Sequence, residues 1–218
     1  MTVPQEVKIG MLLTDQVQLL DMAAVDLLQM ASPEYMRIVG VPEPVASQGR
    51  SVKILYIGKP GAAKVQEVTA TPGVCLTHTT ADSEVAPGNL DILLIPGPDP
   101  NNTPAQESLE FLRAHNEHKT TTLVICTGAL LGAHSGIYNG RNVTGPRMLE
   151  PLLKEKFPDA HWDFSVRSVQ DGHLWTAGGI TNGLDLVASF IRATYPKEVA
   201  EFVCSMAEVG DRPLKYEA

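Results

Sequence analysis

The feature that most constrains this sequence is a strand that stops at a cysteine and is followed at once by a helix. Residues 121–125 are β-branched or apolar, Cys126 and two small residues follow, and residues 129–134 begin a helical pattern. This order predicts a nucleophile elbow, which presents a side chain at the carboxyl edge of a sheet. The N-terminus of the next helix favours a thiolate there. The alternative is a buried structural cysteine that ends a strand.

Apolar runs alternate with amphipathic segments along the whole chain. Residues 90–95 are almost continuously apolar, which is typical of a strand buried on both faces. The alternation predicts a mostly parallel sheet with helices on both faces, and no linker divides it, so we expect one α/β domain over residues 1–218. The expected strands are residues 7–13, 35–40, 52–57 and 74–79 (partly antiparallel), 90–95, 121–125, and a hairpin of 164–169 with 174–177; the expected helices are residues 19–30, 105–118, 148–157, 180–195 and 197–209.

Composition and charge argue against several kinds of partner. The chain has 218 residues, 44% of them hydrophobic, and a net charge of −8 without a Lys/Arg cluster, so neither nucleic acid nor an anionic membrane surface is expected to bind. No apolar run approaches about 18 residues, and the N-terminus has no signal-peptide pattern. Three widely spaced cysteines with no Cys-x-x-Cys fit a reducing cytosol. We expect a cytoplasmic protein without a metal or cofactor motif.

Three predicted strand ends should converge on one edge of the sheet, because ligands of open parallel sheets bind beyond the carboxyl ends of the strands. They carry Asp21, the loop 96–99, and Cys126 with Thr127. Asp21 either handles a proton, if burial raises its pKa, or caps its own helix. The backbone N–H of Thr127 can donate to an oxyanion, and its hydroxyl can reach a substrate. Thr127 can also be the N-cap of the next helix. None of the six histidines stands in a motif that predicts a Cys-His dyad.

Several segments together resemble the ThiJ/PfpI superfamily, and in particular its isocyanide (isonitrile) hydratase-like branch. They are Leu93-Leu94-Ile95-Pro96-Gly97, Ile125-Cys126-Thr127-Gly128-Ala129, the stretch from Trp175 to Asp185, and Gln18-Leu19-Leu20-Asp21. The resemblance implies a flavodoxin-like three-layer sandwich, commonly a homodimer, that needs no cofactor. It also implies Cys126 as the nucleophile, Asp21 as the carboxyl that handles the proton and Thr127 as a hydrogen-bonding group. The reaction that it implies is hydration of an isocyanide to an N-formamide through a thioimidate.

Two departures bear on the substrate. The usual Pro-Gly-Gly loop of the superfamily is Pro96-Gly97-Pro98 here, and proline has no N–H to donate to an oxyanion. Either this oxyanion donor is missing, or Gly97 or Asp99 supplies the N–H after a shift of the loop. Arg147 follows the elbow helix, where it either flanks a pocket for a polar or acidic substrate or lies on the surface. We therefore expect Gly97, Pro98, Asp99 and Arg147 near the substrate. The chain is also similar to uncharacterised fungal members of the superfamily, some of which are expected to serve secondary metabolism.

Three functions remain open on sequence alone. The first is a cofactor-independent, cysteine-dependent hydratase or hydrolase that acts on a small molecule. The second is glyoxalase-type chemistry on a 2-oxoaldehyde, which normally needs a histidine or glutamate near the thiol. The third is a redox sensor or chaperone-like dimer in which Cys126 oxidises to a sulfinic acid. Such a sensor needs no oxyanion hole, so Pro98 is compatible with it.

Overall fold

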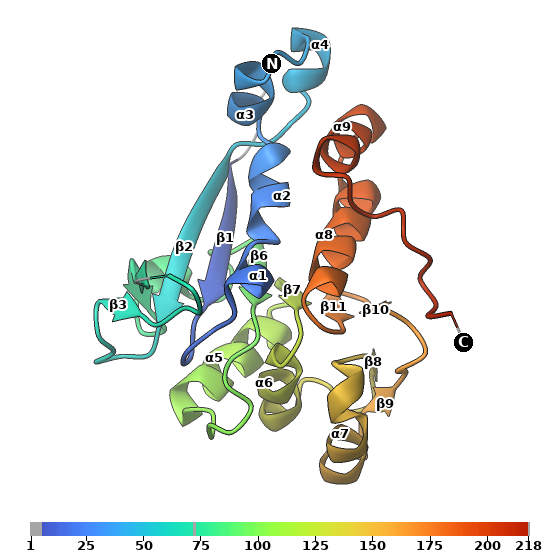
Figure 1. Ribbon diagram of the computed structural model, residues 1–218. Coiled ribbons are helices and arrows are strands. Elements are labelled where there is room, and N and C mark those ends of the chain that lie inside the picture. Colours follow the sequence, from blue (N-terminus) through green and yellow to red (C-terminus); the bar gives the residue numbers. More distant parts are fainter. Residues whose placement is uncertain (1–5, 72, 218) are drawn as a thin grey trace.

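The computed structural model describes residues 6–71 and 73–217, so the signal-peptide prediction falls partly on residues outside it. Its main sheet has seven strands in the order β10-β11-β7-β6-β1-β2-β5 (Figure 1). The pairs from β11 through β7, β6, β1 and β2 to β5 are parallel, and β10 joins β11 in an antiparallel hairpin. The strands are β1 (Val7–Leu12), β2 (Val52–Gly58), β5 (His78–Thr79), β6 (Ile92–Ile95), β7 (Thr121–Val124), β10 (Ser168–Asp171) and β11 (Leu174–Ala177).

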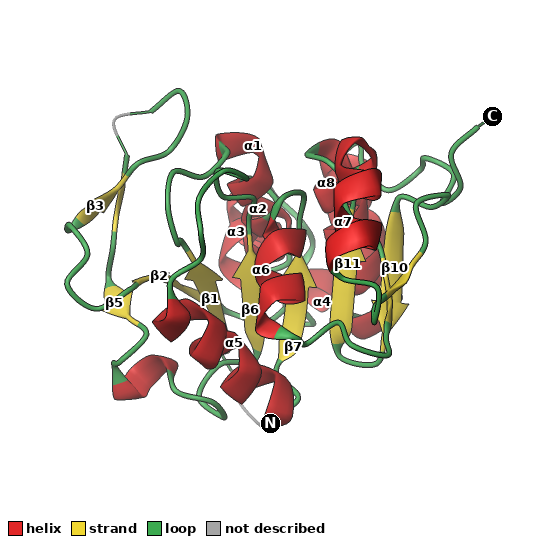
Figure 2. Ribbon diagram, turned by 90° about the horizontal axis from the view of Figure 1, so that it is seen from below, coloured by secondary structure: helices red, strands yellow, loops and turns green. Residues whose placement is uncertain are grey.

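Helices cover both faces of this sheet, which gives the three-layer α/β sandwich expected from the alternating pattern (Figure 2). One apolar cluster joins the sheet to α1–α4, α8 and α9, and a second joins its other face to α5 and α6. The helices are α1 (Leu19–Met22), α2 (Val25–Met30), α3 (Pro33–Ile38), α4 (Glu43–Ala46), α5 (Gln106–Glu117), α6 (Gly128–Ser135), α7 (Glu150–Lys156), α8 (Thr181–Thr194) and α9 (Lys197–Ala207), with short 3₁₀ turns η1 (Ser83–Val85) and η2 (Arg147–Leu149).

Strand β6 shows why its sequence is almost continuously apolar. Ile92 and Leu94 belong to one core cluster, whereas Leu93 and Ile95 belong to the cluster on the opposite face. Successive side chains of a strand point to opposite faces, so a strand covered on both sides needs an apolar residue at every position. The prediction of a doubly buried strand at this place is confirmed.

The predicted strand over residues 35–40 is wrong, because this segment forms most of α3. The Ser32 hydroxyl accepts a hydrogen bond from the Tyr35 N–H (3.2 Å) and so caps the helix, and Pro33 occupies its first turn. A proline at that position loses no helical hydrogen bond, and its fixed φ suits the helix. The Ser-Pro pair that suggested the end of one helix is in fact the start of the next one.

Other boundaries differ from the expected ones. The helix expected over residues 19–30 is interrupted by a turn at Ala23-Ala24, which separates α1 from α2. Residues 74–79 divide into β4 (Val74–Cys75), antiparallel to β3 (Val65–Gln66), and β5, which is parallel to β2. The hairpin around Asp171-Gly172 is present, but its first strand begins at Ser168 rather than at residue 164. Strands β8 (Asn142–Val143) and β9 (His161–Trp162) form a small parallel pair.

The arrangement brings the carboxyl ends of β1, β6 and β7 to one edge of the sheet, because these three strands are neighbours and run in the same direction. The loops that follow them carry Asp21, residues 96–99 and Cys126. Among the helices of the described part of the chain, none is both long and apolar enough to cross a membrane.

Candidate active site

The elbow at Cys126 is a strained turn between β7 and α6. Cys126 has a φ of 56°, in the left-handed region that side chains other than glycine rarely adopt. Its N–H donates to the Gly178 carbonyl (3.2 Å), and the Ile125 N–H donates to Ile95 (3.0 Å). Gly128 is required next to the turn, because a Cβ there would lie 2.7 Å from the Ile95 carbonyl oxygen. Such backbone strain costs on the order of 1–3 kcal/mol and is typical of functional sites.

Asp21 lies inside the protein beside this elbow. Its side chain is fully buried, and its Oδ2 atom accepts a hydrogen bond from the Gly97 N–H (3.1 Å). Its Oδ1 atom has no hydrogen-bond partner among the described residues, while the carboxyl interacts with the Cys126 thiol. Asp21 is not the N-cap of α1, since that position belongs to Gln18. The capping alternative is therefore wrong, and the carboxyl is free to act on the sulfur.

Burial raises the pKa of the Asp21 carboxyl to about 6, although the hydrogen bonds from Gly97 and Cys126 oppose this shift. Burial also raises the pKa of the Cys126 thiol, and the negative charge of Asp21 raises it further. The backbone N–H groups of Ile180 and Thr127 bind the sulfur and lower the thiol pKa. Burial and the Asp21 charge raise the thiol pKa by more than the Ile180 and Thr127 N–H groups lower it. The expectation of a thiolate at neutral pH is therefore not supported. At neutral pH, Cys126 is therefore a thiol and Asp21 beside it is a carboxylate.

The loop after β6 packs tightly over the elbow. A Cβ on Gly97 would collide with the Thr127 hydroxyl and the Asp21 carboxyl, so only glycine fits. The Thr127 hydroxyl donates to the Pro98 carbonyl (2.7 Å), and the Asp99 N–H donates to the Gln16 carbonyl (3.1 Å). Thr127 stands at the N-cap of α6 without capping it through its side chain.

These hydrogen bonds bear on the missing donor at Pro98. The N–H groups of Gly97 and Asp99, which the sequence offered as replacements, are both engaged by acceptors of the protein itself. The backbone donors that face the sulfur come instead from Thr127 and Ile180. Ile180, at the start of α8, also has a positive φ of 39°. Sequence reasoning quoted Ile180 within the family segment but gave it no role.

The C-terminal tail reaches this side of the molecule and was not foreseen. It returns from α9 along α8 toward β10 (Figure 1), and the Tyr216 N–H donates to the Ser165 carbonyl (3.0 Å). The guanidinium carbons of Arg147 and Arg167 each lie 4.5 Å from the centre of the Tyr216 ring. Arg147 is thus an exposed residue that lies against an aromatic ring, and its position beside a substrate stays a prediction.

The tail also holds the start of α8. The Tyr216 hydroxyl accepts a hydrogen bond from Asn182 Nδ2 (2.9 Å). Arg167 and Arg212 both donate to Asn182 Oδ1 (3.3 Å each). Asn182 lies two residues after Ile180, whose N–H binds the Cys126 sulfur. A single sequence gives no sign of this link, because its members are far apart along the chain.

The remaining candidates lie outside the site. His115 is fully buried, and its ring contacts Thr120 Oγ1 and the Val85 carbonyl (3.0 Å each) near the opposite end of β7. Cys75 is exposed and Cys204 is buried, both as free thiols. Within the described residues, no group of at least three His, Cys, Asp or Glu side chains could hold a metal ion.

The fold and the elbow define a class of α/β proteins that carry a cysteine nucleophile at the edge of a parallel sheet. Residues 9–193 match the family described as DJ-1/PfpI, and the chain belongs to that family. A curated relative, the isonitrile hydratase of Pseudomonas putida, is 26% identical over 209 residues, which cover 94% of this chain and 80% of the relative.

Solved structures show the same fold at lower identity. A ThiJ/PfpI family protein from Pseudomonas syringae has a TM-score of 0.72 at 19% identity, with 97% of this chain and 78% of that chain covered. Drosophila melanogaster DJ-1beta has a TM-score of 0.71 at 16% identity, with 94% of this chain and 99% of that chain covered. These likenesses establish the flavodoxin-like architecture.

Proposed function

We propose that the protein is a cofactor-independent enzyme of the isocyanide hydratase type, which adds water to a small molecule through a covalent bond to Cys126. The observation that carries this proposal is the pairing of a fully buried Asp21, whose pKa is raised to about 6, with a thiol at a strained elbow. Perturbed groups in such a setting are typical of catalytic sites. The relationship to the isonitrile hydratase of Pseudomonas putida supports the same assignment.

The first half of the reaction joins the substrate to the sulfur. As the sulfur attacks the terminal carbon of R–N≡C, the thiol proton moves to the Asp21 carboxylate. The carboxyl then gives this proton to the attacked carbon, which yields the thioimidate Cys–S–CH=N–R. A carboxyl with a pKa of about 6 suits both transfers near neutral pH, because general acid–base catalysis works best when the pKa lies near the working pH.

The second half releases the product. Water adds to the thioimidate carbon while Asp21 takes one of its protons and passes it to the substrate nitrogen. The carbon–sulfur bond then breaks, the proton of the new hydroxyl group passes through Asp21 to the sulfur, and R–NH–CHO leaves. The sum is R–N≡C plus water giving R–NH–CHO, so no oxidant or reductant is required. The N–H groups of Ile180 and Thr127 stabilise the sulfur as negative charge builds up on it.

The loop at Pro98 favours an isocyanide over a carbonyl substrate. Attack on an ester or a 2-oxoaldehyde creates an oxyanion in the first step and needs donors about 2.7–3.1 Å from that oxygen. The N–H groups of Gly97 and Asp99 are occupied, and Pro98 has none. An isocyanide carbon carries no oxygen, so its first step needs no oxyanion hole. Gly97, Pro98, Asp99 and Arg147 remain our proposed residues around the substrate, and a homodimer and a cytoplasmic location remain predictions.

The test offers one alkyl and one aryl isocyanide to the protein and measures the N-formamide by mass spectrometry. We expect turnover by the wild type and a loss of at least about 1,000-fold in Cys126→Ser, because the covalent step disappears. Cys75→Ser, which removes an exposed thiol, is the matched control and should retain full activity.

Formation of no formamide from either compound would refute the proposal. Conversion of methylglyoxal to lactate would instead support the glyoxalase alternative. Oxidation of Cys126 to a sulfinate by peroxide, in a protein without any turnover, would support redox sensing.

A further inference from the structure

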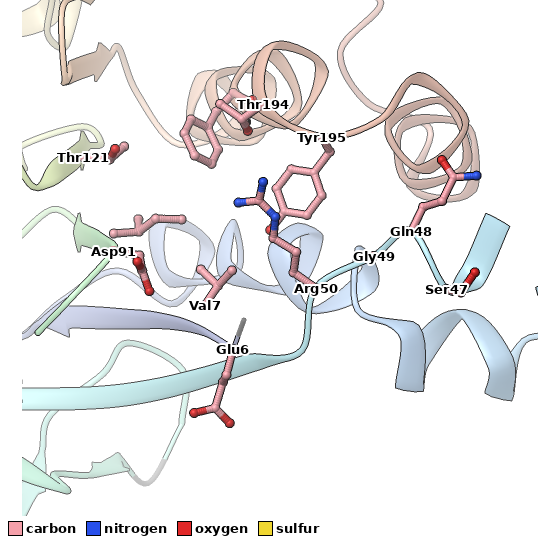
Figure 3. Close-up of a pocket in the computed structure, with 12 residues that line it drawn as sticks. Glu6, Val7, Ser47, Gln48, Gly49, Arg50, Asp91, Thr121, Thr194 and Tyr195 are labelled. Carbon is pink, nitrogen blue, oxygen red and sulfur yellow. Dashed lines mark hydrogen bonds between the residues drawn. The ribbon is translucent and has the colours of Figure 1, made fainter. Parts of the chain in front are cut away.

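A hollow lies at the amino ends of the strands, on the edge opposite Cys126. Its volume is about 590 Å³, within the usual range for small-molecule sites. The first residues of β1, β6 and β7 line it, together with the end of α8 and the turn after α4 (Figure 3). The proposed reaction makes no use of this region.

Tyr195 supplies an unsatisfied polar group in this hollow. The residue is only 7% exposed, and its hydroxyl oxygen is buried without a hydrogen-bond partner among the described residues. Figure 3 shows the ring directed from the end of α8 toward Arg50. A buried hydroxyl without a partner is unfavourable, and an orphaned group of this kind calls for an explanation such as an absent ligand.

Arg50 supplies a cation that is free to bind. Its guanidinium carbon lies 5.3 Å from the centre of the Tyr195 ring, which orients the group beside the hydroxyl. None of the ion pairs found between described residues involves Arg50. A planar guanidinium with open donors is well suited to a carboxylate, which it can bind through two parallel hydrogen bonds.

The opposite wall has the other sign of charge. Asp91 and Glu6 line it; Figure 3 places Asp91 across from Arg50 and Tyr195, whereas the Glu6 side chain points away from both. One Asp91 oxygen accepts the Lys8 N–H (2.8 Å), which leaves the second oxygen of the carboxylate for another donor. The Asp91 carboxylate disfavours a phosphate or another dianion, whereas an ammonium group would satisfy it. Phe190 contributes an apolar surface to the same hollow.

We propose that this hollow binds a small zwitterion of the amino-acid type. Its carboxylate would contact Arg50 and the Tyr195 hydroxyl, its ammonium group would face Asp91, and its apolar side chain would lie against Phe190. The proposal is independent of the reaction at Cys126, since neither group of residues takes part in the other site.

Calorimetric titration of the full chain with L-leucine tests the proposal. We expect a Kd of about 1 mM or tighter, and binding at least about tenfold weaker for N-acetyl-L-leucine, which lacks the cation, and for isoamylamine, which lacks the carboxylate. Arg50→Gln should weaken L-leucine binding by at least about tenfold, and Tyr195→Phe by about threefold. Lys197→Gln, which removes an exposed cation near Tyr195, and Cys126→Ser should bind like the wild type.

Three results would overturn the proposal: no heat of binding with L-leucine, equal affinity for N-acetyl-L-leucine, or unchanged affinity in Arg50→Gln. Equal affinity for the acetylated compound would mean a site for anions alone. Circular dichroism of each variant shows whether a loss of binding reflects a loss of folding.

Discussion

Polar side chains are closely packed at the carboxyl edge of the sheet, whereas at the amino edge they line an open hollow. At the carboxyl edge, Asp21, Gly97 and Thr127 are packed so closely that a single extra carbon on Gly97 would collide with its neighbours. At the amino edge, Arg50 and Tyr195 line an open hollow of about 590 Å³. The crowded edge fixes atoms for chemistry, whereas the open edge leaves donors for a ligand. Volume alone would therefore point to the wrong edge for the reaction.

The largest expected difference between the two edges is in kcat/KM, and replacement of Asp21 by Asn should reveal it. The amide can still accept the Gly97 N–H but cannot move a proton, so kcat/KM for an isocyanide should fall by about 100- to 10,000-fold. Arg50→Gln, at the other edge, should change kcat/KM by less than about twofold. An active Asp21→Asn variant would remove the carboxyl from the mechanism.

The same variant should also be more stable at pH 7. Because the pKa of Asp21 is about 6 in the folded state against an ordinary value of 3.8, the folded state binds this proton more tightly than the unfolded state. The contribution of Asp21 to stability is present below pH 3.8 and is lost as the pH rises through 6. Asp21→Asn should therefore gain up to about 3 kcal/mol at pH 7 and almost nothing at pH 4 in urea unfolding.

The pH dependence of the wild type comes next in size. Asp21 must be ionised to accept the thiol proton, so kcat/KM should rise about tenfold per pH unit below about pH 6 and then level off. The apparent pKa belongs to the Asp21–Cys126 pair. A flat profile between pH 5 and pH 8 would contradict the assignment, and a ligand that binds at the amino edge should leave the profile unchanged.

Tyr216→Phe tests how the tail supports the crowded edge. The Tyr216 hydroxyl accepts a hydrogen bond from Asn182 Nδ2, and its loss should loosen the start of α8. The hydrogen bond from the Ile180 N–H to the sulfur should then weaken. We expect the rate of Cys126 alkylation by iodoacetamide at pH 7 to fall by about threefold to tenfold, because the thiol pKa rises further. Lys215→Ala, in the same tail, should react as the wild type does.

The smallest expected effect concerns Pro98. Since Asp99 donates to Gln16 and Pro98 accepts from Thr127, glycine at position 98 should leave the loop in place and change isocyanide turnover by less than about threefold. A gain of tenfold or more would show that the native site lacks a donor that its reaction needs. A gain confined to ester hydrolysis would agree with the proposed function.

The sequence predicted most of the framework for identifiable reasons. The doubly buried β6, the elbow and the convergence of Asp21 with Cys126 follow from apolar patterning and from the geometry of parallel strands. The apolar residues among 35–40 suggested a strand, but the Ser32 cap and Pro33 start helix α3 there. The occupied donors of the 96–99 loop and the contacts of Tyr216 depend on residues far apart along the chain, which no local pattern encodes.

The left-handed backbone at Cys126 has a consequence for efforts to improve this protein. Glycine would occupy that turn without the steric penalty, which amounts to about 1–3 kcal/mol for other residues. A library selected only for survival of heat would therefore enrich variants that have discarded the thiol. Such a selection would have to require both heat resistance and turnover, because a substitution at position 126 that increases stability abolishes the reaction.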